Sequence, residues 1–310
     1  MLKDIAFVFP GQGSQAIGMG KDFYDKSPLV QDIFKKASNR LGIDMCALMF
    51  EENENLNETE FAQPAILLVS AAALRLFQEN MDITPKFVLG HSLGEITSLI
   101  AAGALDMYDA LELVRARGLL MKKACEGKNA AMMVLVGLDD EKSENICEEA
   151  RQSGHKIWAA NYNSDGQIVI AGLKDDLNLY ADKFKADGAK RVMLLPMSVA
   201  SHCPLLEDAK APLREKLEAF IKESFKSPVI SNVNAKAYSS KKEAVELLEN
   251  QLVSPVLYKQ SVSRQKADAF IEFGGSVLKG LNKRLNNAPT FSITDTATLE
   301  ETLNTIKEAK

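Results

Sequence analysis

Residues 86–105 read KFVLGHSLGEITSLIAAGAL, with one serine, Ser92, between the glycines Gly90 and Gly94. The apolar run up to Gly90 predicts a short buried strand, and the apolar spacing from residue 95 to residue 105 predicts a helix. The five residues from Gly90 to Gly94 fit the pattern G-x-S-x-G, in which a tight bend between strand and helix lifts a serine hydroxyl clear of the backbone. This stretch is therefore either an ordinary turn or a bend that presents Ser92 as a nucleophile.

The segments on both sides of this bend alternate between strand and helix patterns. Buried strands are expected at residues 4–9 and 86–90, and helical spacing covers residues 28–41, 64–80, 95–105 and 109–125. Alternation of this kind predicts an α/β unit with a mainly parallel sheet.

The pattern changes after about residue 130. Strands are expected at 131–138, 156–163, 167–172 and 190–197, with helices at 140–153 and 175–188. This βαββαβ order is that of a ferredoxin-like unit. Further helical and α/β patterns resume at 204–225, 228–234, 241–252 and 268–287, which favours an insertion. The predicted fold is α/β: an α/β-hydrolase-like large subdomain (1–127 and 198–310) with an inserted ferredoxin-like subdomain (128–197).

The composition excludes several classes of protein. The 310 residues are 46% hydrophobic and 25% charged, with a formal net charge of −5. The negative charge and the lack of a basic stripe with aromatic residues argue against a nucleic-acid partner. No apolar run approaches the length of a membrane span, and the N-terminus lacks the pattern of a secretory leader. The four cysteines form no CxxC pair and no cluster with histidine, so we expect reduced thiols, no metal site and a cytoplasmic location.

The chain has only three histidines that could serve as a general base for Ser92. His91 is next to Ser92, but neighbouring side chains on such a bend diverge, so local packing is expected for it. His155 falls in a Ser-Gly-His turn of the insert, where solvent exposure is expected. His202 follows the last strand of the insert, on a loop well placed to take a proton from a serine. A structural, hydrogen-bonded histidine is the alternative for His202.

The loop after the first strand, Gly11-Gln-Gly-Ser-Gln15, matches the start of a dinucleotide-binding fingerprint together with Ala16. That fingerprint requires an acidic residue at the end of a second strand about 20 positions later. Asp32 is the residue there, and it lies within a helical pattern, so no cofactor is expected. The glycine-rich turn can instead bring backbone N–H groups, that of Gln12 among them, close to a substrate carbonyl.

Arg117 occupies the apolar stripe of the helix predicted at 109–125. A buried guanidinium destabilises a protein unless it is paired. Two interpretations remain: a buried salt bridge to another helix, or a cation that receives an anionic group of a substrate.

Several segments together resemble the malonyl-CoA:acyl carrier protein transacylases of bacterial fatty-acid synthesis, in order and in approximate spacing. They are FVFPGQGSQ (7–15), QPAI (63–66), GHSLGE (90–95), Arg117-Gly118 with the helix that follows to Met121, VIAG (169–172), SVASHC (198–203), NQLVSPV (250–256) and LNKR (281–284). The resemblance covers nearly the whole chain.

The resemblance implies a role for each matching position. Ser92 would be the acylated nucleophile and His202 the base, while the backbone N–H groups of Gln12 and Leu93 would form the oxyanion hole. Arg117 would hold the malonyl carboxylate. Four further positions match residues around the substrate site: Met121, Asn161, Asn232 and Gln251, the last supplying a main-chain carbonyl that orients the histidine.

The implied reaction moves a malonyl group from malonyl-CoA to the phosphopantetheine thiol of acyl carrier protein and releases coenzyme A. Because carrier proteins are acidic, docking would need a basic patch. The candidates are Lys122, Lys123, Lys190, Arg191, Lys279, Lys283 and Arg284. The chain departs from the family pattern at Phe273-Gly-Gly-Ser276, which lacks a proline, and at Tyr258, where many relatives carry tryptophan.

Two other functions stay open from the sequence. A serine esterase or thioesterase of the α/β-hydrolase type shares the bend, but it usually has an HGGG-like loop and an acidic triad member before the histidine. Neither is evident here. A non-enzymatic binding module would leave an exposed serine on such a bend without a role.

Overall fold

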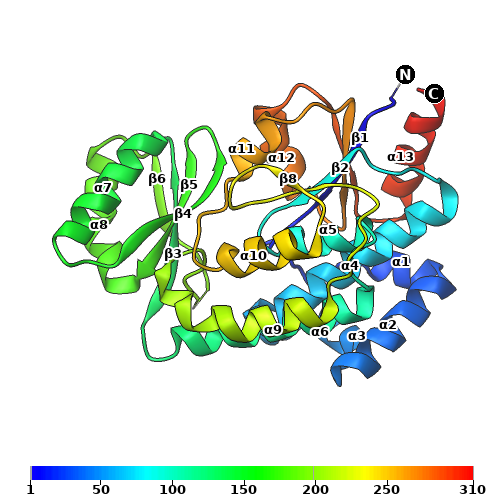
Figure 1. Ribbon diagram of the computed structural model, residues 1–310, viewed down its shortest axis with the longest axis horizontal. Helices are drawn as coiled ribbons and strands as arrows, with labels where there is room; N and C mark the ends of the chain where they lie inside the picture. The colour runs from blue at the N-terminus through cyan, green and yellow to red at the C-terminus, as the bar shows by residue number, and fades with distance from the viewer. Residues whose placement is uncertain (1, 198, 310) are drawn as a thin grey trace.

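Two β-sheets organise the computed structural model, which describes residues 2–197 and 199–309 (Figure 1). Sheet A has the strand order β10-β9-β1-β2-β7-β8. Its strands are β1 (Ile5–Phe9), β2 (Phe87–Gly90), β7 (Val229–Ile230), β8 (Ala237–Tyr238), β9 (Ala269–Phe273) and β10 (Thr290–Ile293). All neighbours are parallel except β7 and β8, which pair antiparallel at one edge. The predicted mainly parallel sheet is confirmed.

Helices cover both faces of sheet A, which explains the continuous apolar sequence of β1, IAFVF. Phe7 and Phe9 belong to the main core, while Ala6 and Val8 pack in a second cluster on the opposite face. The helices of the large unit are α1 (Lys21–Lys26), α2 (Pro28–Leu41), α3 (Met45–Phe50), α4 (Thr59–Asn80), α5 (Leu93–Ala101), α6 (Met107–Cys125), α9 (Lys210–Phe220), α10 (Lys241–Gln251), α11 (Tyr258–Ser263), α12 (Val277–Leu285) and α13 (Thr296–Glu308), with short 3₁₀ turns at Asn55–Asn57 and Pro204–Ala209.

Sheet B is antiparallel and has the order β4-β5-β3-β6, which is the ferredoxin-like arrangement expected for the βαββαβ segment. Its elements are β3 (Ala130–Val136), α7 (Asp140–Gln152), β4 (Ile157–Ser164), β5 (Gln167–Leu173), α8 (Lys174–Ala186) and β6 (Arg191–Leu194). This unit lies at one end of the molecule, opposite the two chain termini (Figure 1). The subdomain limits 128–197 stay a prediction, and Ser198 at the second limit lies outside the described residues.

The alternation of side chains in sheet B gives its two faces different neighbours. Met133 and Leu135 of β3 pack in the unit's own core with α7 and α8. Met132, which precedes Met133 in the strand, belongs to the main core of the large unit, and Val134, between Met133 and Leu135, packs against that core. The small unit is therefore held to the large one by the second face of its own sheet.

Three differences from the predicted elements stand out. Helix α4 begins at Thr59, five residues before the predicted start, so that Pro64 lies inside it. Proline removes one helical hydrogen bond. The first turn of α4 also packs closely on α6, since a Cβ on Gly118 would lie 2.7 Å from the Cα of Glu60. Strand β6 ends at Leu194, three residues early, and the elements β10 and α13 after residue 287 were not predicted.

Helix α4 is the one described helix that is long and apolar enough, by length and composition, to cross a membrane. Its most apolar stretch of 18 residues is 83% buried inside the protein, as in the core helix of a globular fold.

The bend between β2 and α5 is tightly packed against the end of β1. Ser92 has φ 53° and ψ −104°, a backbone conformation that a side-chain-bearing residue rarely adopts. A Cβ on Gly94 would lie 2.0 Å from the carbonyl oxygen of Phe9, and one on Gly90 would lie 2.0 Å from the backbone of Gly94. Both glycines are required because the chain passes too close to itself for any side chain.

We therefore expect Gly94→Ala to lower the free energy of unfolding by at least about 2 kcal/mol, since the added methyl group forces backbone apart in a closely packed region. Gly280→Ala is the matched control, because Gly280 is exposed on α12 and a Cβ there meets nothing within 4 Å. That control should raise stability by about 0.5–1 kcal/mol. Urea unfolding measures both, and an unchanged Gly94→Ala would contradict the packing argument.

Candidate active site

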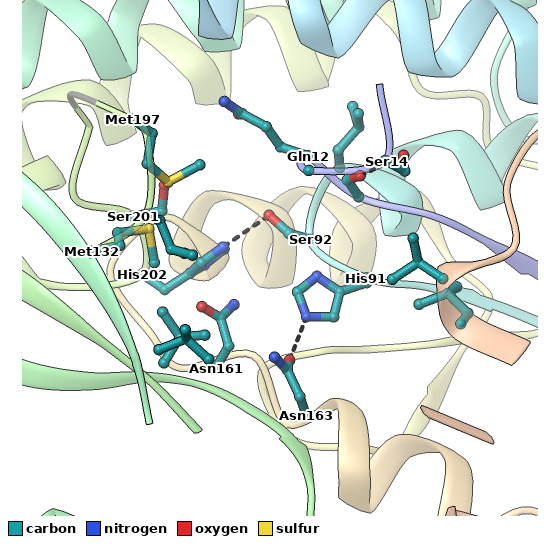
Figure 2. A pocket seen from close by; sticks show the side chains of 18 of the residues that line it. Gln12, Ser14, His91, Ser92, Met132, Asn161, Asn163, Met197, Ser201 and His202 are labelled. Atoms are coloured by element: carbon teal, nitrogen blue, oxygen red, sulfur yellow. Dashed lines mark hydrogen bonds between the residues drawn. The ribbon is translucent and has the colours of Figure 1, made fainter. Parts of the chain in front are cut away.

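Ser92 in the bend is in direct contact with His202, which lies on the loop where the chain returns from the small unit to the large one (Figure 2). The Oγ of Ser92 lies 2.8 Å from Nε2 of His202. Nδ1 of the same ring lies 2.7 Å from the backbone carbonyl oxygen of Gln251, at the end of α10. Because a carbonyl can only accept, Nδ1 carries the proton and Nε2 is free to accept one from Ser92. A chain of hydrogen bonds therefore runs from Ser92 through His202 to the backbone carbonyl of Gln251.

His202 is held neutral by its surroundings. The side chain is buried, and this burial, together with the positive charge of Arg117, lowers the pKa of His202 to about 3. The carbonyl of Gln251 acts in the opposite direction. A neutral imidazole at physiological pH is the form that can take the serine proton.

Two backbone N–H groups beside Ser92 have no hydrogen-bond partner among residues 2–197 and 199–309: those of Gln12 and Leu93. Both residues line the same cavity as Ser92. Leu93 is the first residue of α5, so its N–H belongs to the positive end of that helix. An oxyanion that formed next to Ser92 could accept from these two groups.

Arg117 of α6 lies beside the serine and is only 2% exposed. Its guanidinium donates to Ser92 Oγ at 3.1 Å, to Gln251 Oε1 at 3.1 Å and to Gln63 Oε1 at 2.9 Å. Within the described part of the chain, no carboxylate pairs with it, and its buried Nε has no partner. Burial lowers the pKa of Arg117 to about 10, which still leaves it charged at neutral pH. The predicted alternative, a salt bridge to another helix, is wrong.

A cavity of about 330 Å³ opens over these groups and lies between the two units. On the side of the large unit, the cavity is lined by the Gly11 loop, the bend, α6 and α12. Sheet B of the small unit forms the opposite wall. Met121 and Asn161 both line it, as expected for a substrate site. Asn232 and Gln251 lie behind the bend instead, where the side chain of Asn232 accepts from the Ser92 N–H at 2.7 Å.

The segment from residue 6 to residue 276 matches the sequence model for the acyl transferase domain. The chain belongs to the acyl transferase family. It is 40% identical to the malonyl CoA-acyl carrier protein transacylase of Bacillus subtilis, over 99% of this chain and 98% of that one.

Solved structures of acyl transferases agree with the fold. The malonyl-CoA:acyl carrier protein transacylase from Helicobacter pylori superimposes with a TM-score of 0.96 at 46% identity, over 99% of both chains. A malonyl-transacylase solved in complex with its type II PKS acyl-carrier protein superimposes with a TM-score of 0.93 at 39% identity, over 98% of this chain and all of that one.

The other two histidines of this acyl transferase have their own partners. His91 Nε2 lies 2.8 Å from the side-chain oxygen of Asn163, and His91 also lines the cavity (Figure 2). His155 is partly exposed, with 31% of its side-chain surface accessible, and its Nδ1 lies 2.8 Å from the carboxylate of Asp176. Neither ring forms a hydrogen bond with Ser92 in the described part of the chain.

Sequence reasoning did not single out two buried polar residues at this site, Gln63 and Glu95, although both stand in the segments that carry the family resemblance. Gln63 receives a hydrogen bond from Arg117, and its amide nitrogen donates to Thr59, which in turn donates to the side chain of Gln12. The signal for such residues is a polar side chain inside an otherwise apolar helix.

We expect the His202 ring to stay neutral, with its proton on Nδ1, between pH 8 and pH 5, because burial and Arg117 depress its pKa. Imidazole ¹⁵N–¹H correlation spectra can test this in a chain with three histidines, and His202→Gln assigns the signal. A titration midpoint near 6.5, the value of an ordinary histidine, would contradict the buried geometry.

Proposed function

We propose that this acyl transferase moves the malonyl group of malonyl-CoA to the phosphopantetheine thiol of acyl carrier protein, through an ester on Ser92. The observation that carries the proposal is Arg117, a buried cation with no carboxylate partner among the described residues, 3.1 Å from the serine oxygen. A malonyl thioester has a free carboxylate close to its reactive carbonyl, so it can satisfy the guanidinium and reach the serine at once. The similarity to malonyl-CoA:acyl carrier protein transacylases of Bacillus subtilis and Helicobacter pylori supports the same reaction.

In the first half of the reaction, the Ser92 oxygen attacks the thioester carbonyl while Nε2 of His202 takes its proton. The carbonyl oxygen becomes an oxyanion and accepts from the N–H groups of Gln12 and Leu93. The carbon–sulfur bond then breaks, and the imidazolium returns the proton to the sulfur of the departing coenzyme A. A malonyl ester of Ser92 remains.

In the second half, the thiol of the carrier's phosphopantetheine takes the place of coenzyme A. His202 removes the thiol proton, the sulfur attacks the ester carbonyl, and the same two N–H groups stabilise the oxyanion. The carbon–oxygen bond to Ser92 breaks and the serine recovers its proton. The order requires ping-pong kinetics, with no complex that holds both thiols.

The alternative of a general serine hydrolase is less well supported by the site. Hydrolases of that type usually orient the histidine with a carboxylate, whereas a backbone carbonyl does so here. A carboxylate that oriented His202 in this buried space would also compete with the malonyl carboxylate for Arg117.

The proposal includes a cytoplasmic location. All four cysteines are free thiols, and three of them are buried, which is typical of a reducing compartment.

Intact mass measured after mixing with malonyl-CoA should show one added malonyl group in the wild type and none in Ser92→Ala. Arg117→Ala should slow this acylation by about two to three and a half powers of ten, because the malonyl carboxylate is left buried without a partner. Acetyl-CoA has no such carboxylate, so its slow reaction should be spared. Arg117→Lys should recover little, since an ammonium cannot reproduce the planar fork.

A labelled Ser92→Ala protein would overturn the assignment of the nucleophile. Equal losses for malonyl-CoA and acetyl-CoA in Arg117→Ala would mean that the arginine supports the fold and does not select the acyl group.

We also propose that the exposed face of α12 receives the carrier protein. Val277, Leu278 and Leu281 of this helix line the cavity. Its outer face carries Lys279, Lys283 and Arg284, which form no ion pair with any described residue, unlike Lys122, which Glu58 and Glu60 neutralise. Free cations on a helix that lines the cavity would attract an acidic carrier.

Transfer to the carrier should therefore weaken with added salt more than transfer to free pantetheine. Lys283→Glu should slow transfer to the carrier and leave acylation by malonyl-CoA unchanged. Lys307→Glu is the control, since Lys307 is exposed on α13, which does not line the cavity. Equal salt dependence for the two acceptors would contradict this docking face.

A further inference from the structure

The bend carries a second pattern that the proposed chemistry does not use. Ser92-Leu-Gly-Glu95 has the spacing of a capping box, in which the serine side chain would accept from the N–H of residue 95 and the glutamate would reach back to the serine N–H. Neither bond forms. The Ser92 side chain does not cap α5, and its oxygen lies against His202 instead. The Ser92 N–H donates to Asn232, so Glu95 is released for other contacts.

Glu95 is completely buried directly behind the bend. Its Oε2 accepts from the backbone N–H of Asn232 at 2.9 Å and from the side-chain amide of Gln251 at 2.7 Å. Its Oε1 accepts from the hydroxyl of Tyr238 at 3.1 Å. The first two partners can only donate at these atoms, whereas a tyrosine hydroxyl can donate or accept.

The two donors on Oε2 are the residues that hold the reacting groups. The side chain of Asn232 accepts from the Ser92 N–H at 2.7 Å and donates to the carbonyl of Gly90 at 2.8 Å, which fixes both ends of the bend. Gln251 accepts from Arg117 through its side chain and from His202 through its backbone carbonyl.

Glu95 is the nearest partner of the Gln251 amide and helps to set its direction. An amide has one accepting end and one donating end, and the two ends are distinguished only by their partners. Here the NH₂ end meets a carboxylate oxygen, so the carbonyl end must face the guanidinium of Arg117. Without an acceptor at the position of Oε2, the NH₂ group loses its shortest hydrogen bond and keeps only longer ones, to the Ser92 carbonyl oxygen at 3.2 Å and to Asn232 Oδ1 at 3.4 Å.

We propose that Glu95 is a positioning residue of the active site, which orients Gln251 and Asn232 and thereby holds Ser92, His202 and Arg117 in register. The proposal rests on Ser92 as the nucleophile but not on the identity of the acyl donor. It explains why α5 forms neither of the two capping-box hydrogen bonds, although Ser92 and Glu95 have the required spacing. The glutamate supports the catalytic groups from behind, and the free N–H of Leu93 stays available to a substrate.

Three substitutions separate the placement of the acceptor from its charge. Glu95→Gln keeps a carbonyl oxygen at Oε2, and its NH₂ group can donate to Tyr238. Glu95→Asp keeps the charge but withdraws the oxygens by about one carbon–carbon bond, and Glu95→Ala removes both acceptors. Tyr238→Phe is the control, because it removes only the contact to Oε1.

The readouts are the rate of Ser92 modification by a fluorophosphonate, the rates of acylation by malonyl-CoA and by acetyl-CoA, and the melting temperature. Each rate is counted per folded molecule. Loss of an acceptor for two buried donors should slow all three reactions in Glu95→Ala by about 100-fold. Glu95→Gln should stay within about tenfold of the wild type and react faster than Glu95→Asp, while Tyr238→Phe should change the rates by less than about threefold.

The pattern differs from that of Arg117→Ala, which should spare acetyl-CoA. If Glu95→Ala does not fold, the comparison of reaction rates between Glu95→Gln and Glu95→Asp still tests the proposal. Rates per folded molecule that equal the wild type in Glu95→Ala or Glu95→Asp would overturn the proposal, as would a glutamine variant slower than the aspartate variant. A wild type that the fluorophosphonate labels at Ser92 but malonyl-CoA does not would overturn the proposed function alone.

Discussion

The close approach of α5 to the end of β1 is the constraint on which the site depends. Gly90 and Gly94 leave no room for a Cβ, and the backbone at Ser92 takes a positive φ. The strain is small against the packing of a fully buried strand–helix junction, so the surrounding core maintains it. Its consequence is that the serine side chain points into the cavity while the first N–H of the helix stays free.

A second consequence concerns charge. His202 is oriented by a neutral backbone carbonyl, and Arg117 is surrounded by amide and hydroxyl groups. A carboxylate next to His202 would lie close to Arg117 and would satisfy it permanently. The neutral carbonyl therefore lets one small buried space contain both an oriented imidazole and a guanidinium that is still able to bind a substrate carboxylate. Glu95, the buried carboxylate behind the bend, is linked to Arg117 through the amide of Gln251.

The inserted unit completes the cavity through the simplest property of a strand. Alternate residues of β3 face opposite sides, so that Leu135 packs on α7 and α8 while Met132 and Val134 line the site. The same residues that anchor the small unit to the large one thus form a wall of the substrate cavity. Flexible methionine side chains on this wall, Met132 and Met197, suit a site that exchanges two different thiol carriers.

The sequence by itself determined the local features: the strand–bend–helix at residues 86–105, the βαββαβ order after residue 130, and an arginine on an apolar helix stripe. These depend on periodicity, glycine stereochemistry and the energetic penalty of a buried charge, all of which act within a few residues. Only the tertiary structure decided how Arg117 is satisfied and what Glu95 contacts. Ser92 and Glu95 are three residues apart and fit a capping box, yet the local bonds give way to Asn232, Gln251 and His202, which lie more than 100 residues along the chain. Contacts over that distance in sequence are set by the packing of the whole fold, and no local pattern encodes them.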